Sequence, residues 1–233
     1  MLKVALAQME VRAGHPDINL EKMLKFIEDA KKEAADIIIF PHYSIPGSML
    51  RGPMYFPSYT TSSSFTEDCI ACNDDILEST SGITVLFNNY SYDENLYLAA
   101  QNGKLIYAED DLETFKIKIK GKHYKIAYSL VNEYLTSHLD FVEESFDFCV
   151  LFSASPFVIG KQKEFDRYFA YKAKALGCPI FYINCVGTQN KGKTIYSFDG
   201  STTVYNSKGD IVLRANSFEE SLMFVDLGKV DIM

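Results

Sequence analysis

A phosphate-loop pattern is the first part of the sequence whose residue types could do chemistry. Residues 187–194 read GTQNKGKT, which fits G-x-x-x-x-G-K-[ST] letter for letter. Such a loop binds nucleotides when a helix begins straight after its Lys-Thr pair, because the N–H groups and the helix dipole then meet the phosphates. Here the β-branched, aromatic and turn-forming run IYSFDGSTT follows. The context therefore disfavours an ATPase or GTPase with Lys193 on the phosphates and predicts a surface loop over residues 190–197.

Two further features could serve a metal or a redox centre. Cys69 and Cys72 form a lone C-x-x-C pair, whereas zinc would need a second pair or well-spaced histidines, and a redox pair would need a strand before it. We therefore expect buried helix cysteines and no metal. Among the four histidines, His42 is the candidate for a functional role. It follows the apolar run IIIF and Pro41, at the sheet edge where α/β proteins usually place their chemistry.

Alternating strand and helix patterns must position these residues. Apolar positions with a 3.6-residue period predict a helix that Asp17 caps, and Gly177 is typical of a helix C-terminus. Asn102-Gly103 is typical of a tight hairpin turn. The chain reads as one α/β domain over residues 1–233, with helical crossovers and antiparallel hairpins. The predicted strands cover residues 2–8, 37–40, 83–87, 95–101, 104–109, 124–130, 148–153, 179–186, 202–206, 210–215 and 222–227, and the predicted helices cover residues 17–30, 65–78, 133–144 and 161–176.

Composition and charge exclude several classes of protein. The formal charge is -8, which disfavours a dominant nucleic-acid surface. The basic stretch KIKIKGKHYK, residues 116–125, alternates in the manner of an exposed strand edge. No apolar run approaches the ~20 residues of a membrane span, and the N-terminus does not resemble a signal peptide. An odd number of cysteines favours a reducing compartment. We expect a cytoplasmic protein without membrane or nucleic-acid contacts.

Several motifs resemble those of one enzyme superfamily. The N-terminal part carries VALAQ, NLEK and then ADIIIFPH, and the C-terminal half carries SASPFVIGK, YINCVGTQ and FDGSTTVYNSKGD. This series resembles the nitrilase, or carbon–nitrogen hydrolase, superfamily, and in particular the glutaminase domain of glutamine-dependent NAD synthetases. The resemblance covers nearly the whole chain and implies a four-layer α-β-β-α sandwich. It also places the segment 186–189 at the end of a buried strand. The match of the following Gly-Lys-Thr to the phosphate-loop pattern is then a coincidence.

The resemblance implies a catalytic set that this chain has lost. Family members hydrolyse amides or nitriles with a Glu–Lys–Cys set, in which cysteine attacks, glutamate takes its proton and lysine stabilises the tetrahedral intermediate. The matching positions here are His42 for the glutamate, Asp111 for the lysine and Ser129 for the cysteine, or Tyr128 if the register slips by one. The same resemblance implies a substrate pocket lined by Tyr128, Ser153, Ser155 and Phe157, and no cofactor.

Two hypotheses of different classes follow. An anion at Asp111 would oppose the developing oxyanion, and losing even one oxyanion donor costs ~3 kcal/mol. The first hypothesis is therefore a pseudoenzyme that acts as a binding or regulatory partner, in which fold and function have separated. In the family the glutaminase domain is fused to a synthetase, which suggests a stand-alone NAD synthetase as partner. Family members also suggest a homodimer formed through helices. An amide or glutamine-like molecule is a further candidate ligand. The second hypothesis is an active amidase or glutaminase in which His42 activates Ser129 as nucleophile.

Overall fold

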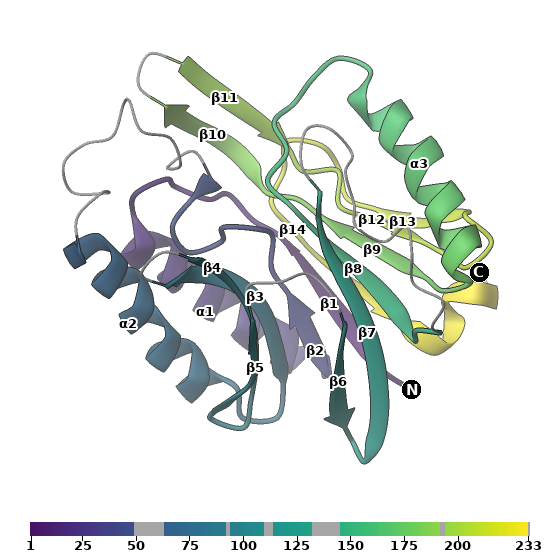
Figure 1. Cartoon of the computed structure of the whole chain (residues 1–233), viewed down its shortest axis with the longest axis horizontal. Coiled ribbons are helices and arrows are strands. Elements are labelled where there is room, and N and C mark those ends of the chain that lie inside the picture. Colours follow the sequence, from purple (N-terminus) through teal and green to yellow (C-terminus); the bar gives the residue numbers. More distant parts are fainter. Residues whose placement is uncertain (49–62, 92–93, 110–113, 132–144, 192–193, 233) are drawn as a thin grey trace.

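Two six-stranded sheets face each other in the computed structural model (Figure 1), which describes residues 1–48, 63–91, 94–109, 114–131, 145–191 and 194–232. The first sheet has the strand order β14-β1-β2-β3-β4-β5. Strands β1, β2 and β3 are parallel, whereas β14, β4 and β5 join antiparallel at the two sides. Its strands are β1 (Lys3–Gln8), β2 (Ile37–Ile39), β3 (Thr84–Ser91), β4 (Glu94–Gln101), β5 (Lys104–Glu109) and β14 (Ser221–Asp226).

The second sheet has the order β13-β12-β9-β8-β7-β6. Its parallel centre is β7, β8 and β9, and antiparallel strands close both sides. A separate two-stranded ribbon, β10–β11, extends beyond it (Figure 1). The strands are β6 (Thr114–Ile119), β7 (Lys122–Val131), β8 (Phe148–Ser153), β9 (Ile180–Ile183), β10 (Val186–Lys191), β11 (Thr194–Asp199), β12 (Thr203–Tyr205) and β13 (Ile211–Arg214).

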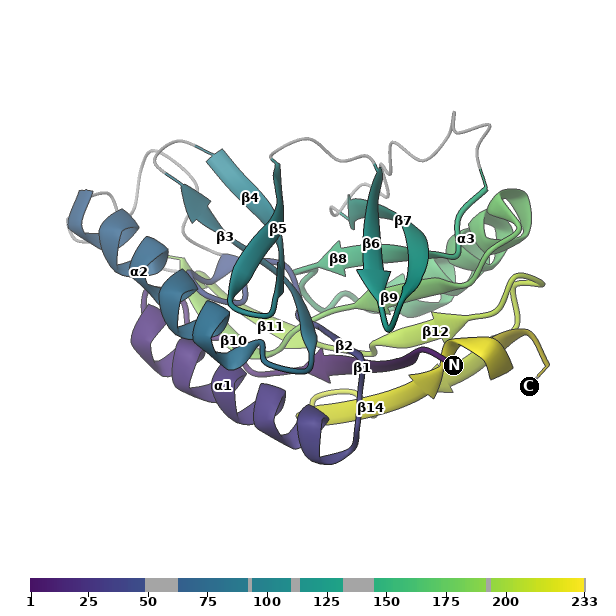
Figure 2. The ribbon, with the colours of Figure 1, turned by 90° about the horizontal axis from the view of Figure 1, so that it is seen from below.

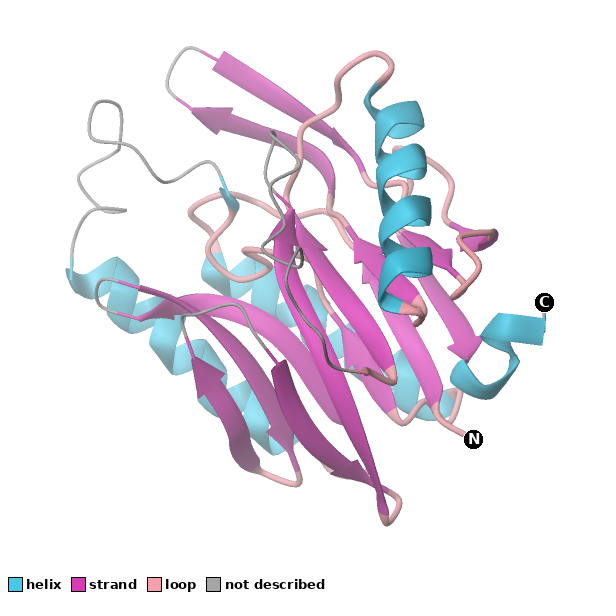
Figure 3. Cartoon of the chain, turned by 45° about the vertical axis from the view of Figure 1, so that its right-hand side comes forward, coloured by secondary structure: helices cyan, strands magenta, loops and turns pink. Residues whose placement is uncertain are grey.

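Helices cover the outer face of each sheet, so the layers run α-β-β-α (Figure 3). Helices α1 (Pro16–Lys32) and α2 (Ser63–Ser79) pack on the first sheet, and α3 (Lys161–Leu176) packs on the second. The cluster between the two sheets is built from side chains of both. A short 3₁₀ helix, Leu227–Ile232, follows β14. The predicted four-layer sandwich is confirmed.

Helix α1 forms because its apolar residues repeat at the helical period and face the first sheet. Met23, Ile27 and Ala30 are buried on that side, and Pro16 at the first turn has no N–H to leave unpaired. Asp17 does not cap the helix as predicted. The helix begins one residue earlier, with His15 at the N-cap, so Asp17 lies within the first turn. There the negative charge of its carboxylate interacts favourably with the helix dipole.

The phosphate-loop pattern lies in the β10–β11 ribbon. Strand β11 begins at Thr194, where a nucleotide-binding loop would begin its helix, so the sequence argument against that helix is confirmed. The predicted loop over residues 190–197 is wrong. Gly187 to Lys191 pair with Thr194 to Phe198 in an unbroken antiparallel register, and the β-branched and aromatic residues of the second arm, TIYSF, suit a strand. Lys193 lies outside the described residues.

The basic stretch forms a hairpin at the edge of the second sheet. Lys120 and Gly121 take positive φ values of 48° and 83° and turn β6 into β7, a turn that the sequence analysis missed. Lys116 and Lys118 are exposed, while the alternate residues of β6 are buried between the sheets. The predicted exposed edge is confirmed. The predicted helix over residues 133–144 lies outside the described residues. None of the helices that the structure describes is long and apolar enough to cross a membrane.

Candidate functional site

His42 lies at the junction of the two sheets, in the turn that follows β2. Its backbone N–H donates to the carbonyl of Ser153, at the end of β8 in the other sheet, over 3.1 Å. The next residue, Tyr43, holds a positive φ of 54°, an uncommon conformation for a non-glycine residue, and its N–H donates to Asn88 Oδ1. Gly47 closes the turn where a Cβ would meet the Ala13 Cα at 2.4 Å. The backbone of this turn is thus tightly specified by its neighbours.

The His42 ring is buried among aromatic side chains. Only 2% of the residue is exposed, and its ring centroid lies 3.7 Å from that of Tyr43. On its other side the ring stacks on Tyr97 at 5.8 Å, and Nδ1 lies 3.5 Å from the Tyr97 hydroxyl. That separation is at the limit of a hydrogen bond, so the contact is weak. The imidazole therefore packs as one ring in an aromatic layer.

Tyr128 belongs to the same layer and fills space between the sheets. Its ring lies 5.2 Å from Tyr97 and 5.6 Å from Phe115, and its hydroxyl lies 2.6 Å from that of Tyr107. Phe152 contacts both Tyr97 and Tyr128. These rings, Tyr97, Tyr107, Phe115, Tyr128 and Phe152, are called the aromatic cluster below. Tyr128 is 1% exposed, so a substrate could reach its ring only if the cluster moved.

Ser129 faces away from the aromatic cluster. Successive side chains of a strand point to opposite faces of the sheet, so Ser129 shares the α3 side with Ala127 and Val131. The Ser129 hydroxyl is buried and has no hydrogen-bond partner in the part of the chain that the structure describes. The Ser129–His42 hydrogen bond that an activated serine would need is therefore not formed.

Val131 is the last residue of strand β7, and its side chain lies on the α3 side, as that of Ser129 does. In the parallel register of β7 and β8, Val131 is the partner of Ser153, the residue whose carbonyl holds the His42 N–H. Ser129 pairs two residues earlier, with Leu151. Strand β7 continues to Val131, beyond the end that the sequence pattern predicted. The continuous apolar run IAYSLV contains no signal that marks where the strand stops.

The three predicted pocket residues after β7 are not brought together. The Ser153 hydroxyl is buried 3.3 Å from the hydroxyl of Tyr182, whose pKa is raised well above its usual value by burial. Ser155 is held through its backbone, which bonds the amide side chain of Asn184 in both directions. Phe157 is 45% exposed and packs against Phe218, with 5.4 Å between the ring centroids. Asp111 lies outside the described residues.

A buried ion pair joins two of the motifs, and the sequence analysis did not single it out. Lys161 Nζ, at the start of α3, lies 3.0 Å from Asp199 Oδ1, and the two side chains are 10% and 6% exposed. The ammonium also donates to the Ser155 carbonyl. Burial lowers the pKa of Lys161, and the Asp199 carboxylate opposes that shift. The ion pair thereby fastens the loop that contains SASPF to the turn that contains FDG. Both motifs belong to the same family resemblance, and this was the signal from which the pair could have been predicted.

The cysteines of the C-x-x-C pair are buried in α2, as predicted. Burial is the main cause that raises the pKa of the Cys72 thiol to about 11 and the pKa of Cys69 further, so both are protonated at neutral pH. Within the described residues no cluster of three or more His, Cys, Asp or Glu side chains could hold a metal ion.

Comparison with known proteins agrees with this architecture. Residues 3–109 match the family model described as carbon-nitrogen hydrolase. The glutamine-dependent NAD(+) synthetase of Aquifex aeolicus is 27% identical over 263 residues, covering 98% of this chain and 43% of that protein. The corresponding enzyme of Acinetobacter baylyi is 24% identical over 240 residues, covering 95% and 43%. The chain spans less than half of the length of these relatives.

Solved structures show the same fold. The glutamine-dependent NAD+ synthetase of Acinetobacter baumannii superposes with a TM-score of 0.73 at 23% identity, covering 96% of this chain and 45% of that one. A cysteine-to-serine mutant of the Nesterenkonia AN1 amidase, of the nitrilase superfamily, gives a TM-score of 0.76 at 16% identity, covering 99% and 93%. The chain therefore has the carbon–nitrogen hydrolase fold, and residues 3–109 carry the sequence pattern of that family. Its resemblance to glutamine-dependent NAD synthetases is confirmed over most of its length.

Proposed function

We propose that this chain is a carbon–nitrogen hydrolase-fold protein without amidase or glutaminase catalysis, and that it acts as a binding or regulatory partner in NAD biosynthesis. The observation that carries the proposal is the separation of Ser129 from His42. The hydroxyl lies on the α3 side of β7 without a hydrogen-bond partner in the described residues, while the imidazole stacks on Tyr97 at the cluster between the sheets. A serine needs a hydrogen-bonded base to become a competent nucleophile.

The other residue that the resemblance places at the cysteine position supports the same proposal. Tyr128 is 1% exposed and packs in the aromatic cluster, with its hydroxyl 2.6 Å from that of Tyr107. A substrate could reach this side chain only if the cluster moved. The glutamate position holds an imidazole, which packs between the rings of Tyr43 and Tyr97.

A stand-alone, ammonia-using NAD synthetase is the partner we propose. The support is the similarity over most of this chain to proteins named glutamine-dependent NAD(+) synthetase, of which the chain spans only 43%. A separate synthetase chain would supply the part of those relatives that this chain does not match, which we take to be the synthetase part. A small amide or a glutamine-like molecule is a further candidate ligand, on the same resemblance.

Catalysis is tested by ammonia release from glutamine and from simple amides, with the Aquifex aeolicus enzyme as positive control. We expect no release above the rate of a buffer blank. Release that Ser129→Ala abolishes would instead establish the Ser129–His42 amidase. Release that survives Ser129→Ala would overturn the proposal and place the nucleophile elsewhere.

Partner binding is tested separately, by mixing the purified chain with an ammonia-using synthetase at micromolar concentration and following the complex by light scattering. We expect a complex larger than either protein. Two unchanged peaks would exclude the synthetase as partner, while leaving the conclusion about catalysis to the ammonia assay.

A further inference from the structure

The hairpin formed by β6 and β7 concentrates positive charge on an acidic protein. Residues 116–125, called the basic hairpin below, contain five lysines, one histidine and no acidic residue, in a chain whose formal charge is -8. Strand β6 ends the strand order of the second sheet (Figure 2), and the turn projects past the ends of the neighbouring strands (Figures 1 and 3). The proposed function makes no use of this charge.

Two of the five lysines are paired with carboxylates of the same chain. Lys120 Nζ lies 2.5 Å from Asp36 Oδ1, and Lys122 Nζ lies 4.0 Å from Asp147 Oδ1. These two ammonium groups already have counter-charges. A partner would therefore be recognised by the lysines on the outer face of the two strands.

The positive side chains of that outer face lie opposite one another. Lys116 is directly opposite Lys125, and Lys118 is directly opposite His123. Lys116 and Lys118 are exposed, and neither forms an ion pair with the residues that the structure describes. Like charges directly opposite each other destabilise a sheet. The basic hairpin therefore carries an electrostatic cost that favours a role outside the fold.

Protection of the sheet edge accounts for only part of this charge. Lysines on an edge strand discourage pairing with other chains, which suits Lys116 and Lys118 on β6. Lys125 lies on β7, where its N–H donates to the Asp147 carboxylate and its carbonyl accepts the Asp147 N–H. Its backbone is thus already bonded on the side away from β6, so Lys125 protects no open edge.

We propose that the outer face of the basic hairpin binds an acidic segment of a partner protein. Lys116 and Lys118 are two residues apart on β6, a separation of ~7 Å, which is also the spacing of alternate side chains in an extended segment. A segment with an acidic residue at every second position therefore places successive carboxylates beside successive lysines. These carboxylates also relieve the repulsion between Lys116 and Lys125.

The surroundings favour an acidic polypeptide over nucleic acid or a lipid surface. Single strands of nucleic acid bind through exposed aromatic rings, whereas the tyrosine of the hairpin, Tyr124, is 7% exposed and packs between the sheets. Ile117 and Ile119 are also buried, so they are not available for insertion into lipid.

Net charge favours the same occupant. A chain with a formal charge of -8 is repelled by an extended anionic surface such as a DNA duplex or an acidic membrane. A short acidic segment interacts mainly with charges within a Debye length, ~8 Å at physiological ionic strength. Such a segment can therefore contact the basic hairpin without approaching the acidic remainder of the chain.

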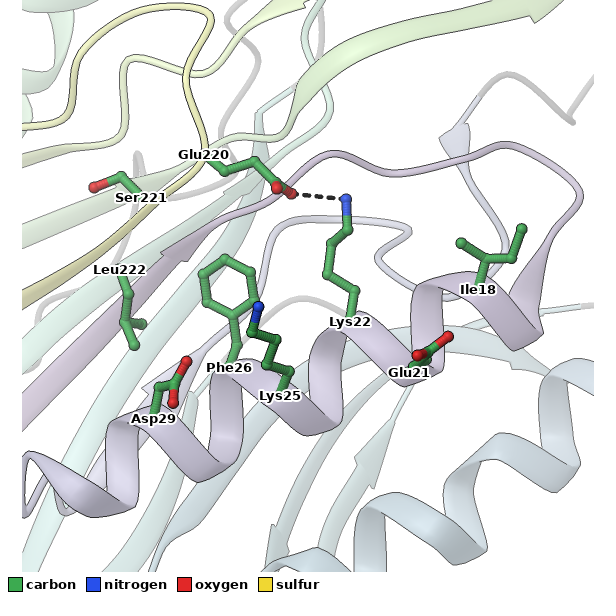
Figure 4. A pocket seen from close by; sticks show the side chains of 9 residues that line it. All are labelled: Ile18, Glu21, Lys22, Lys25, Phe26, Asp29, Glu220, Ser221 and Leu222. Atoms are coloured by element: carbon green, nitrogen blue, oxygen red, sulfur yellow. Dashed lines mark ion pairs between the residues drawn. The ribbon is translucent and has the colours of Figure 1, made fainter.

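A groove between helix α1 and strand β14 also presents lysines at the surface (Figure 4). It has a volume of about 530 Å³. Lys22 Nζ lies 2.8 Å from Glu220 Oε1, and Lys25 interacts electrostatically with Asp29. The positive charges of this groove are balanced by carboxylates, so an acidic segment is attracted to the basic hairpin and not to the groove.

Fluorescence anisotropy of a labelled octapeptide in which glutamate alternates with serine tests the binding. We expect a dissociation constant below about 1 mM at low salt, rising at least about tenfold between about 50 and about 300 mM salt. The same peptide with glutamine in place of glutamate should not bind. A constant above about 1 mM, or equal binding of the two peptides, would exclude the proposal. Because the probe is a peptide, the result does not depend on the synthetase proposed above.

Charge reversal locates the binding surface. Lys116→Glu/Lys118→Glu places each glutamate opposite a basic residue of β7, so we expect it to fold and to raise the dissociation constant at least about tenfold. The matched control is Lys25→Glu/Lys163→Glu, which changes the net charge equally at exposed lysines of α1 and α3 and should change the constant less than about twofold. Thermal unfolding checks that both variants fold. Equal effects of the two double variants would contradict the assignment to the basic hairpin.

The class of partner is tested with two competitors. Duplex DNA and vesicles with an anionic lipid surface are added to the protein with its bound peptide. We expect neither to displace the glutamate peptide at an equal concentration of negative charge. Displacement by either one would assign the basic hairpin to that class of ligand and would overturn the choice of an acidic polypeptide.

Discussion

Lys161 and Asp199 form a buried ion pair that fastens the loop after β8 to the turn after β11, with 3.0 Å between Nζ and Oδ1. The two residues come from different motifs of the sequence, so the pair joins those motifs in space. The Lys161 ammonium also donates to the Ser155 carbonyl, which adds a second bond between α3 and the loop after β8.

Removing one member of this pair should destabilise the protein strongly. Asp199→Ala leaves the Lys161 ammonium buried without its counter-charge, and breaking a buried pair in this way costs about 3 kcal/mol. Urea unfolding with linear extrapolation measures the change. The control is Lys32→Ala, which removes an exposed pair with Asp29 and should leave the unfolding midpoint where it is. Similar changes in the unfolding midpoint for the two variants would show that the buried pair contributes no more to stability than an exposed pair.

Ser129→Ala should keep or slightly increase stability. The Ser129 hydroxyl is buried without a partner in the described residues, so its removal relieves a desolvation penalty of ~1 kcal/mol. Ser153→Ala is the matched control, because it removes a buried hydroxyl that does have a partner, Tyr182 at 3.3 Å. Thermal unfolding of both variants measures the difference. A larger loss at Ser129 than at Ser153 would mean that the serine has a partner that the packing does not reveal.

Restoring the family glutamate should not restore catalysis. His42→Glu places a carboxylate against the rings of Tyr43 and Tyr97, and an uncompensated buried charge costs about 3 kcal/mol. We expect a lower melting temperature and no ammonia release. His123→Glu, on the exposed start of β7 opposite Lys118, is the control and should melt as the wild type does. A well-folded His42→Glu variant that releases ammonia would show that the site still accepts the family's chemistry.

The buried thiols should make stability fall at alkaline pH. Burial raises the pKa of Cys72 from 9.0 to about 11, and Cys178 and Cys185 shift in the same direction. The folded chain then holds protons that the unfolded chain has released, so the free energy of unfolding decreases as the pH rises from about 9 to about 11. Below pH 9 both states hold the thiol proton, and this contribution to stability is complete.

Thiol titration with a chromogenic disulfide reagent across that pH range measures the same effect. We expect no reaction of the native protein at neutral pH and full reaction after unfolding. Cys72→Ala should reduce the alkaline loss of stability. Rapid labelling of native Cys72 at neutral pH would contradict its burial in α2.

Most of the helices and strands could be predicted from hydrophobic periodicity, whereas the four-layer arrangement came from the family resemblance. Helix α3 begins at Lys161 and ends at Leu176, and strand β8 runs from Phe148 to Ser153, as the pattern and the Gly177 cap predicted. The miss at residues 190–197 has a physical reason. Glycine and lysine favour a loop locally, but backbone pairing between β10 and β11 overrode that preference.

The site was less predictable because it depends on register. Side chains alternate faces along β7, so a sequence match that is uncertain by one position cannot say whether the residue at the cysteine position, Tyr128 or Ser129, points between the sheets or toward α3. The structure resolves this, because Tyr128 lies in the cluster between the sheets and Ser129 lies on the α3 side with Ala127. The position of His42 was predictable, because a proline after a buried strand marks the strand end.

The aromatic cluster contributes to the near-ultraviolet circular dichroism of the protein. The chain contains no tryptophan, so this spectrum comes largely from tyrosines, and Tyr97, Tyr107 and Tyr128 are held in fixed mutual orientations. Such a signal requires rigid packing and disappears when a chain keeps its secondary structure but loses its side-chain order. The side-chain order of the protein, including the aromatic cluster, can therefore be followed in solution without a label, by comparing near-ultraviolet and far-ultraviolet spectra of the same sample.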